Sequence, residues 1–332
     1  MVESNNQINA IGGYFEIADK DCECGRMPID GIALNTCRNA LEYIILQIPD
    51  VKRIYVPYYT CEAVVEPLRR LQVEYKFYHI NEQLEISQEI SLGEGDYLIA
   101  NNYFGIRDAY IAKLAKKYGD RLIVDNAQAL FAPALLNVKA AYSTRKYVGV
   151  ADGGFAVGVH AIGIIDYDED NSLEHDSHLY IRKERGAEAG YKDYQKNECK
   201  LDNQQIRRMS PQTKEILYQI NYESILEKRR QNYLYLSQIL GEKNFLQLPS
   251  IDSFTCPMVY PFMTDDESLR GRLIQNKVFV ARYWPNVLEW CNEDELEYKL
   301  TTQIIPLPID QRYGKEDMDR IIEIIRCHEY GK

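Results

Sequence analysis

Long apolar runs are absent from this sequence. The most extended apolar stretches, such as residues 156–165 (AVGVHAIGII), are about half as long as a helix that crosses a bilayer. The first ten residues, MVESNNQINA, are polar and lack the basic start and apolar run of a secretory signal peptide. We therefore expect a cytoplasmic protein without a membrane-spanning segment.

A positive net charge is absent, and closely spaced cysteines are few. The formal net charge of -11 argues against a nucleic-acid partner, because such binding depends on neutralising phosphates. The eight cysteines are scattered along the chain, which favours reduced thiols over a disulfide framework. Cys22 and Cys24 have no second cysteine pair at metal-binding spacing, and His175 and His178 lie in a polar, acidic stretch that reads as a solvated loop. We expect no metal site.

The first 160 residues are rich in short β-branched and aromatic runs that alternate with helical patterns. Apolar residues recur at helical spacing over 40–48 and 111–118, whereas Pro67 argues against an unbroken helix over 61–71. Such alternation predicts an α/β fold with a mainly parallel sheet and helices on both faces. The expected strands cover residues 53–57, 74–80, 96–101, 121–125, 138–143 and 154–159.

The pattern changes after residue 160. A polar, charged stretch precedes one long helix, expected from about 211 to 240, with Ser210 as its cap and Pro211 in its first turn. The rest of the chain, with a final helix from about 315, has the pattern of a smaller α+β unit. We expect an N-terminal segment (1–30), a large α/β domain (31–225) and a small C-terminal α+β domain (226–332).

Residues with useful chemistry follow the expected strands. In open parallel sheets, ligands bind beyond the carboxyl ends of the strands. If the strands share one sheet, a carboxylate, an amide, a hydroxyl, a thiol, an aromatic ring and a lysine face one crevice. These residues are Cys61, Tyr103, Asp125, Gln128, Ser143 and Lys146.

A second feature is the start of the helical pattern near residue 37. Asn35 or Thr36 can cap a helix whose first turn contains Cys37, Arg38 and Asn39. Free backbone N–H groups and the helix dipole favour an anion at such a start, although an ordinary capped helix has the same pattern. The glycines of GVADGG (149–154) match neither G-x-G-x-x-G nor a P-loop, and predict a turn into the next strand.

Pyridoxal 5'-phosphate (PLP) is a ligand that needs all these groups together. Its aldehyde forms a Schiff base with a lysine, its phosphate needs an anion site, and its pyridine nitrogen needs an acidic partner. A free lysine has a pKa of about 10.4, so a nucleophilic lysine must be activated by its surroundings. The alternatives are that Lys146 is a surface lysine and that Asp125 only caps a helix.

Two motifs carry a resemblance to a known family. IVDNAQA (123–129) resembles the D-A-A-Q-A strand end, and STRKYVGVADGG (143–154) the lysine segment, of the DegT/StrS-type sugar aminotransferases, a branch of the fold-type I PLP enzymes. Residues 306–325 are similar to the closing segment of that family, and the likeness extends from about residue 31 to near the C-terminus. It implies a PLP-binding large domain, a smaller α+β domain and a homodimer with sites at the subunit interface.

The resemblance also implies roles for individual residues. Lys146 would form the Schiff base and then move the proton between the substrate carbon and the cofactor. Asp125 would pair with the pyridine nitrogen, and Gln128 would hydrogen-bond in the polar surroundings of the cofactor. The phosphate would be held by Cys37, Arg38, Asn39 and either Ser143 or Thr144.

The chain departs from the family at three places. The family has small residues and a threonine where this chain has Cys37 and Arg38. Residues 205–210 read QIRRMS, without the asparagine that a partner subunit offers to the phosphate in the family's Y-N-Y-R-M stretch. The position of the aromatic that stacks on the cofactor ring corresponds to Cys61. Tyr59, Tyr103 or Phe104 is then expected to supply the aromatic ring beside the cofactor.

The resemblance implies an aminotransferase that moves an amino group from glutamate to a nucleotide-linked keto-sugar, for surface polysaccharide or antibiotic sugar synthesis. The lysine favours this reaction over that of the dehydrase branch of the family, which has histidine at the same position. Two alternatives stay open. One is a different PLP-dependent reaction on a non-sugar substrate, and the other is a degenerate, non-catalytic protein that binds PLP or a sugar nucleotide.

Overall fold

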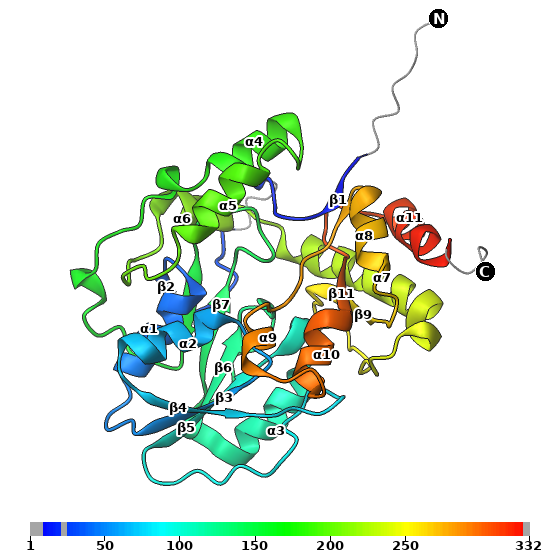
Figure 1. The fold of residues 1–332 in the computed structure, drawn as a ribbon. Helices are drawn as coiled ribbons and strands as arrows, with labels where there is room; N and C mark the ends of the chain where they lie inside the picture. The colour runs from blue at the N-terminus through cyan, green and yellow to red at the C-terminus, as the bar shows by residue number, and fades with distance from the viewer. Residues whose placement is uncertain (1–8, 21–24, 328–332) are drawn as a thin grey trace, which may run out of the picture.

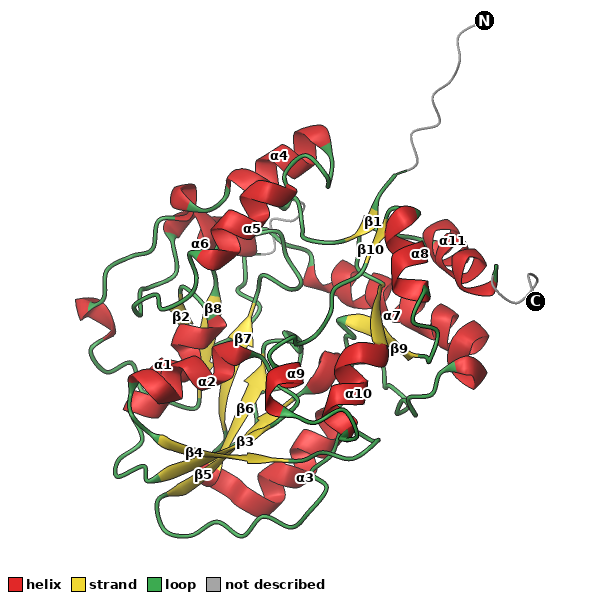
Figure 2. Ribbon diagram, viewed as in Figure 1, coloured by secondary structure: helices red, strands yellow, loops and turns green. Residues whose placement is uncertain are grey.

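The protein consists of a large sheet with helices on both faces and a second group of helices and short strands beside it (Figures 1 and 2). The computed structural model describes residues 9–20 and 25–327, so Cys22 and Cys24 lie outside the described residues.

Seven strands form the large sheet, in the order β2, β8, β7, β6, β5, β3, β4. The pairs from β4 to β7 are parallel, and β8 is antiparallel to both of its neighbours. All six expected strands form within two residues of their expected bounds, so the mainly parallel sheet is confirmed. The strands are β2 (Ile32–Leu34), β3 (Arg53–Pro57), β4 (Glu74–Tyr78), β5 (Asp96–Asn101), β6 (Leu122–Asn126), β7 (Lys139–Ser143) and β8 (Gly154–Val157).

Both faces of the central strands are buried. In β6, Leu122 and Val124 belong to one apolar core while Ile123 belongs to the other, as the two-residue period of a strand requires. The helices α1 (Cys37–Leu46) and α2 (Glu62–Arg70) cover the face of Ile123, and α3 (Asp108–Tyr118) covers the opposite face. The expected layering of helices on both faces is therefore confirmed.

Pro67 lies inside α2 and does not break it, so the expected interruption is wrong. A proline in a helix removes one backbone hydrogen bond. The apolar side of α2, formed by Val64, Val65 and Leu68, is buried against the sheet. This packing holds the helix together across the missing bond, because tertiary contacts supply most of the stability of a short helix.

The prediction of one continuous helix over 211–240 is wrong. Two helices form instead, α6 (Pro211–Leu217) and α7 (Tyr222–Leu240). Ser210 caps α6 as predicted, since its side chain accepts a hydrogen bond from the Thr213 N–H. Asn221 caps α7 in the same way, accepting from Ser224 N at 3.0 Å, and such a side chain favours a new helix start over continuation.

The C-terminal part contains the expected final helix and proline-containing strand. Pro306 and Pro308 lie in β11, which among the described residues pairs with β9 alone. This strand is therefore an edge strand on its other side, where proline is tolerated because no ladder hydrogen bond is needed from its nitrogen. The boundary expected between residues 225 and 226 falls inside α7 and stays a prediction. The elements are β9 (Val259–Met263), α8 (Leu269–Gln275), β10 (Val278–Phe279), α9 (Val287–Trp290), α10 (Leu296–Gln303), β11 (Ile304–Pro308) and α11 (Lys315–Arg326). Short 3₁₀ helices occur at Tyr103–Gly105, Gly119–Arg121, Ile164–Asp166, Ser172–Glu174 and Gly241–Lys243.

The N-terminal residues 9–20 connect the two parts of the molecule. Their strand β1 (Ile11–Gly12) pairs with β10 in the C-terminal part. Farther along, the Ala18 N–H donates to the Gly149 carbonyl at 2.9 Å, just after Lys146. A side chain at Gly149 would collide with the Glu16 carbonyl, so glycine is needed for this close approach.

The polar stretch around His175 and His178 is not the solvated loop that its composition indicates. His175 follows the 3₁₀ helix Ser172–Glu174 and His178 lies in α4 (Ser177–Arg185), which packs against α5 (Tyr191–Cys199); both histidines are buried. The His178 ring packs at a tilt against the stacked rings of Tyr14 and Tyr194, and its Nδ1 lies 3.0 Å from the Asn197 side-chain nitrogen. Ring packing and this hydrogen bond compensate for burying a polar side chain, which the local composition does not reveal.

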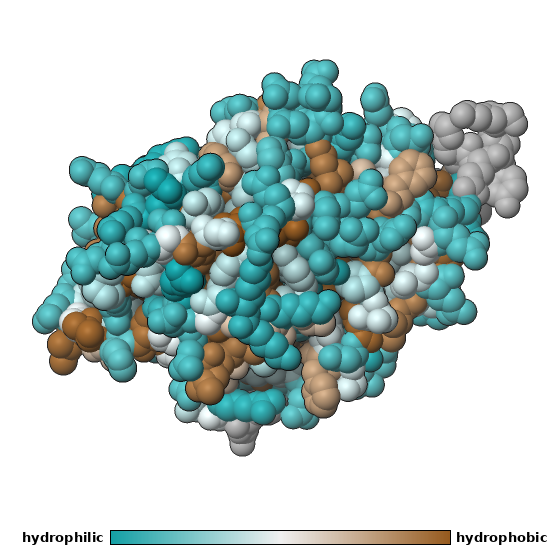
Figure 3. All heavy atoms as spheres, turned by 90° about the horizontal axis from the view of Figure 1, so that it is seen from below, coloured by the Kyte–Doolittle hydropathy of each residue, from teal (hydrophilic) through white to brown (hydrophobic). Residues whose placement is uncertain are grey.

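The surface is mainly hydrophilic on the face shown in Figure 3, where apolar side chains form small separate groups. Among residues 9–20 and 25–327, no helix is both long and apolar enough to cross a membrane.

The glycine pair after the lysine segment packs directly against the start of α1. Gly153 has a positive φ of 124°, and its N–H donates to the Asn35 carbonyl at 2.5 Å. A Cβ at Gly154 would lie within 2.5 Å of the Thr36 carbonyl and the Cys37 nitrogen. The predicted turn is confirmed, and its glycines allow the lysine segment to touch the helix start.

We predict that Gly154→Ala lowers the free energy of unfolding by about 2 kcal/mol, because backbone atoms must move to admit the methyl group. Urea denaturation measures the change. The control is Gly271→Ala in α8, where nothing lies within 4 Å of the added carbon and alanine favours the helix. Equal stability of Gly154→Ala and the parent protein would contradict the close packing.

Candidate active site

Asp125 lies at the carboxyl end of the sheet, between Asn101 of β5 and Ala141 of β7. Its Oδ1 accepts a hydrogen bond from Ala127 N at 2.8 Å and lies 3.8 Å from the Cys37 sulfur. Burial raises the pKa of Asp125, and the charge of Lys146 opposes this rise. The carboxyl group is thus largely enclosed, and the charge of the lysine partly offsets the cost of its ionisation.

Lys146 lies in the turn that follows β7. This turn is closed by backbone hydrogen bonds from Tyr147 and Val148 to the Thr144 carbonyl, both of 2.9 Å. Within the described part of the chain, the Lys146 amine has no hydrogen bond or ion pair, although its charge acts on Asp125 and both nearby thiols. The amine therefore lies close enough to influence the carboxyl group of Asp125 but forms no ion pair with it.

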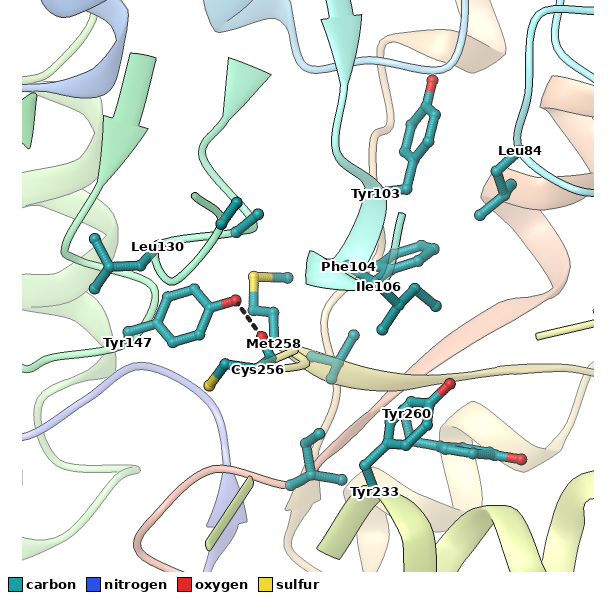
Figure 4. Packing of buried hydrophobic residues seen from close by; sticks show 14 of the residues in the cluster. Leu84, Tyr103, Phe104, Ile106, Leu130, Tyr147, Tyr233, Cys256, Met258 and Tyr260 are labelled. Atoms are coloured by element: carbon teal, nitrogen blue, oxygen red, sulfur yellow. Dashed lines mark hydrogen bonds between the residues drawn. The ribbon is translucent and has the colours of Figure 1, made fainter. Parts of the chain in front are cut away.

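Tyr147 fixes the position of its neighbour Lys146. The ring is fully buried, and its hydroxyl donates to the carbonyls of Gln128 at 2.7 Å and Cys256 at 3.1 Å. Figure 4 shows the hydroxyl pointing at Cys256, with Leu130 beside the ring. The Tyr147 carbonyl accepts from Gln311 Nε2 at 2.6 Å, so the residue after the lysine is anchored at both ends.

Gln128 has one satisfied and one unsatisfied group. Its Oε1 accepts from Phe104 N at 2.9 Å, but its buried Nε2 has no partner among the described residues. An unpaired buried donor costs free energy unless a ligand or water accepts from it. A ligand oxygen at this point would satisfy Gln128, as the predicted cofactor contact requires.

The first turn of α1 is capped, and some of its hydrogen-bonding groups already have partners within the protein. The Thr36 hydroxyl accepts from Asn39 N at 3.0 Å, and the Asn39 side chain donates to the Gln204 carbonyl at 3.0 Å. Asn39 is fully buried. Of the three residues predicted at this helix start, Cys37 is the one that lies beside Asp125.

Arg38 points toward α2 and residues 201–202. Its guanidinium forms ion pairs with Glu66 and with Asp202, the latter at 3.0 Å, and donates to the Leu201 carbonyl at 2.9 Å. A direct contact between Arg38 and a phosphate would have to displace these partners. The predicted phosphate contact stays a prediction.

Two thiols lie next to the lysine and the aspartate. Cys37 is the first residue of α1, and Cys61 is the residue that precedes α2. Burial raises the pKa of both thiols, and the positive charge of Lys146 lowers them by less. Both are therefore protonated at neutral pH, which allows the Cys37 S–H to donate toward Asp125.

An aromatic cluster covers the ends of β3 and β5. Tyr103 donates from its hydroxyl to the Tyr59 carbonyl at 2.8 Å, and its ring centre lies 5.5 Å from that of Tyr59. Trp284 packs edge-on against Tyr59 at 4.8 Å. Phe104 is completely buried, and the charge of Asp125 acts on Tyr103. Tyr103 is thus the predicted aromatic with an electrostatic link to the candidate site.

Two hydroxyls at the end of β7 have different surroundings. Ser143 ends the strand opposite Gly154 and is buried. The Thr144 hydroxyl donates to the Gly153 carbonyl at 3.0 Å, which ties the lysine turn to the glycine pair. Ser143 and Thr144 are both candidates for a phosphate contact, and the Thr144 hydroxyl is already engaged in this hydrogen bond.

The sequence gives no indication of Glu198. This carboxylate, on α5, forms an ion pair with Arg145, the residue before Lys146. Residues 191–199 are mostly polar, so no periodicity marks Glu198 as a partner of Arg145. Arg145 and Lys146 both act on Glu198 because they lie on a turn; in a strand, consecutive side chains would point apart.

The described residues contain no group of three or more His, Cys, Asp or Glu side chains arranged to hold a metal ion. The candidate site therefore consists of a carboxylate, a lysine, an amide donor and a helix start.

Comparisons with known proteins give a clear structural likeness. The structure is similar to the aminotransferase TlmJ from Streptoalloteichus hindustanus, with a TM-score of 0.61 and 13% identity over 90% of this chain and 85% of that one. A DegT DnrJ EryC1 StrS aminotransferase from Brucella abortus has a TM-score of 0.59 and 16% identity over 92% and 87% of the two chains. This chain has the aminotransferase fold.

A third similar structure is Spr1654 from Streptococcus pneumoniae, which has been solved in PLP and PMP forms. Its PMP form has a TM-score of 0.61 and 14% identity over 94% of this chain and 90% of that one. No protein-family model and no curated protein matches the sequence. The predicted fold class is confirmed by the shared aminotransferase fold.

We predict that Asp125→Asn stabilises the cofactor-free protein above pH 7. A pKa that is higher in the folded state means that ionisation favours the unfolded chain, so the cost is present at high pH and disappears below the ordinary aspartate pKa. The gain in melting temperature should therefore shrink as the pH falls from 8 toward 4. Asp294→Asn, at an exposed position, is the control and should change little. A gain that grows toward low pH would contradict the buried-anion assignment.

A second prediction tests whether Arg38 stabilises the fold or binds the cofactor phosphate. Arg38→Ala should lower the free energy of unfolding by about 2 kcal/mol, because Glu66 is largely buried and loses its main partner. Arg69→Ala breaks an exposed ion pair with Glu62 and should cost less than about 1 kcal/mol. If Arg38 instead serves a phosphate, its removal would weaken PLP binding and leave the unfolding curve unchanged.

Proposed function

We propose that the chain is a PLP-dependent sugar aminotransferase of the DegT/StrS type. Its amino donor would be glutamate, and its acceptor a keto-sugar carried on a nucleotide, in surface polysaccharide or related amino-sugar synthesis. The observation that carries the proposal is the meeting of Asp125 and Lys146 at the carboxyl edge of a sheet in the aminotransferase fold.

The residues around this pair fit the cofactor. Gln128 has a buried donor without a partner, Cys37 begins a helix next to Asp125, and the Lys146 amine is free of hydrogen bonds within the described chain. PLP, when bound, supplies an electron sink for bonds at the amino-bearing carbon. These residues offer a nucleophile, an anion for the pyridine nitrogen, an amide donor and a helix dipole for the phosphate.

Each residue has a definite task in this proposal. The Lys146 amine would hold the cofactor by condensing with its aldehyde, with loss of water, and would then carry a proton between the substrate carbon and the cofactor. The Asp125 carboxylate holds the proton of the pyridine nitrogen, and its burial strengthens that interaction. Tyr147 keeps the lysine in place through its two hydroxyl hydrogen bonds.

The homodimer, with sites at the subunit interface, rests on the resemblance described above. The location in the cytoplasm rests on the sequence composition, and the division into a PLP-binding domain over 31–225 and a small domain over 226–332 rests on the sequence pattern together with the resemblance. Ser143, Cys61 and Tyr103 are proposed to line the cofactor pocket, because each follows a strand at the same edge of the sheet.

A second candidate is a non-catalytic protein that binds PLP or a sugar nucleotide. Two observations favour it: the Arg38 guanidinium is engaged by Glu66 and Asp202, and the Cys37 thiol faces Asp125, where the family has a small residue. The two candidates differ in turnover, because only the first converts an amino donor.

The proposed function predicts that the protein reconstituted with PLP has a visible absorption band, which glutamate converts to that of the PMP form. Borohydride reduction followed by peptide mass spectrometry should find the cofactor on Lys146. Lys146→Ala should carry no covalent cofactor and lose at least about 1000-fold in transamination rate, because both the nucleophile and the proton carrier are removed.

Lys139→Ala is the matched control, since Lys139 lies on the same strand-turn unit but donates to the Asp120 carbonyl at 2.8 Å, away from the site. Its labelling and activity should equal those of the parent protein. A band that persists with every amino donor would favour the non-catalytic candidate. Cofactor attached to another lysine would overturn the site assignment.

A further inference from the structure

Arg229 of α7 is a cation enclosed within the protein. The residue is 1% exposed, and it forms no ion pair with any residue that the structure describes. Its Nη1 donates to the Met258 carbonyl at 2.8 Å and its Nε donates to Gln311 Oε1 at 2.9 Å. Its Nη2 is buried and has no hydrogen-bond partner among the described residues. Neutral oxygen atoms therefore hold this charge, without a carboxylate in direct contact.

The Tyr147 ring lies against this guanidinium. The Arg229 Cζ is 4.4 Å from the centre of the ring, and both side chains are fully buried. A cation–π contact of this kind is stronger when water is excluded from it. Because Tyr147 directly follows Lys146 in the chain, Arg229 reaches from a helix of the C-terminal part to the turn that carries the lysine.

Gln311 joins the same two residues by a second route. Its Oε1 accepts from Arg229 Nε, and its Nε2 donates to the Tyr147 carbonyl at 2.6 Å. Arg229 is thus connected to the Tyr147 ring directly and to the Tyr147 backbone through one amide group. Two connections to one residue restrict its rotation as well as its position.

A segment of chain that is attached to the sheet supports both side chains. The Tyr147 hydroxyl donates to the Cys256 carbonyl at 3.1 Å, and the Arg229 guanidinium donates to the Met258 carbonyl two residues later (Figure 4). The Met258 N–H in turn donates to the Phe104 carbonyl at 2.8 Å, beyond the end of β5. The guanidinium can therefore not move away from Tyr147 without breaking hydrogen bonds to this segment.

The stability of the fold does not account for a cation at this position. A buried charge loses its hydration, and apolar side chains of similar volume often serve a protein interior as well or better. An apolar side chain at position 229 could fill the space, but it could not donate hydrogen bonds. Arginine supplies a planar group that stacks on one ring and donates in two directions at once. These are the properties that the contacts with Tyr147, Gln311 and Met258 use.

We propose that Arg229 is a positioning residue for Lys146. By stacking on Tyr147 and binding Gln311, it fixes the backbone from which the lysine side chain departs. The lysine side chain is long and flexible, and a small displacement of a reacting group costs much of its rate. The importance of Arg229 for catalysis rests on the proposed function, whereas the fixation of the turn is a property of the cofactor-free protein as well.

The first test measures the turn in the cofactor-free protein. Hydrogen exchange of residues 144–150, read by peptide mass spectrometry, reports on the backbone amides that close the turn onto the Thr144 carbonyl. Arg229→Met should speed this exchange at least about tenfold relative to that of β6, because the turn opens locally. Gln311→Glu keeps an acceptor for Arg229 but cannot donate to the Tyr147 carbonyl. It should act in the same direction, and it decides the question if Arg229→Met does not fold.

The second test separates positioning from general stability. In the protein reconstituted with PLP, Arg229→Met should slow the formation of the covalent bond to Lys146 about tenfold, followed by the visible band. In a Lys146→Ala background, the same substitution should change the dissociation constant of PLP less than about twofold, because the effect acts through the lysine. A residue that only stabilised the fold would weaken PLP binding in both backgrounds, and that result would overturn the proposal.

Arg230→Met is the matched control, since the neighbouring Arg230 guanidinium donates to the Asp252 carbonyl, and both measurements should equal those of the parent protein. Exchange of residues 144–150 that does not rise relative to β6 in a folded variant would also overturn the proposal. A parent protein that attaches no PLP to Lys146 would instead contradict the proposed function. The exchange measurement contains no PLP and would still decide the role of Arg229.

Discussion

The close contact between the lysine turn and the start of α1 is the constraint on which the candidate site depends. Gly153 donates to the Asn35 carbonyl, and Gly154 has room only for a hydrogen atom against Thr36 and Cys37. These two glycines bring the end of β7 and the first turn of α1 to the same place. With a larger residue there, Cys37 could not approach Asp125, and the lysine and the helix start would not share one site.

Polar anchors then hold the turn from several directions. Asp152, just before the glycine pair, accepts hydrogen bonds from Ser210 N at 2.8 Å and Ser210 Oγ at 2.7 Å, which joins the turn to α6. Tyr147 joins it to the opposite side through Gln128 and Cys256. The lysine therefore sits on a short segment whose two ends are fixed independently. A nucleophile needs such support, because a small displacement costs much of its reactivity.

Much of the fold could be predicted from the sequence, because strand periodicity and the order of strands and helices are local features. The central strands formed within two residues of their expected bounds, and Asp125, Gln128 and Lys146 are proposed from their positions at or after the ends of strands. The break before α7 was missed because the cap at Asn221 overrides a continuous helical pattern. Burial of His178 and the Arg145–Glu198 pair were missed for another reason: both depend on α4 and α5 folding back over the lysine turn, and tertiary contacts of this kind leave no periodic signal.

Residues 9–20 have a consequence for motion. They bond to β10 at one end and to Gly149 beside the lysine turn at the other, while Glu16 forms ion pairs with Arg182 of α4 and with Arg312 near α11. This segment therefore links β10 directly to the residues that follow Lys146. A displacement of β10 relative to the sheet would load these backbone hydrogen bonds, and through them the turn that carries the lysine.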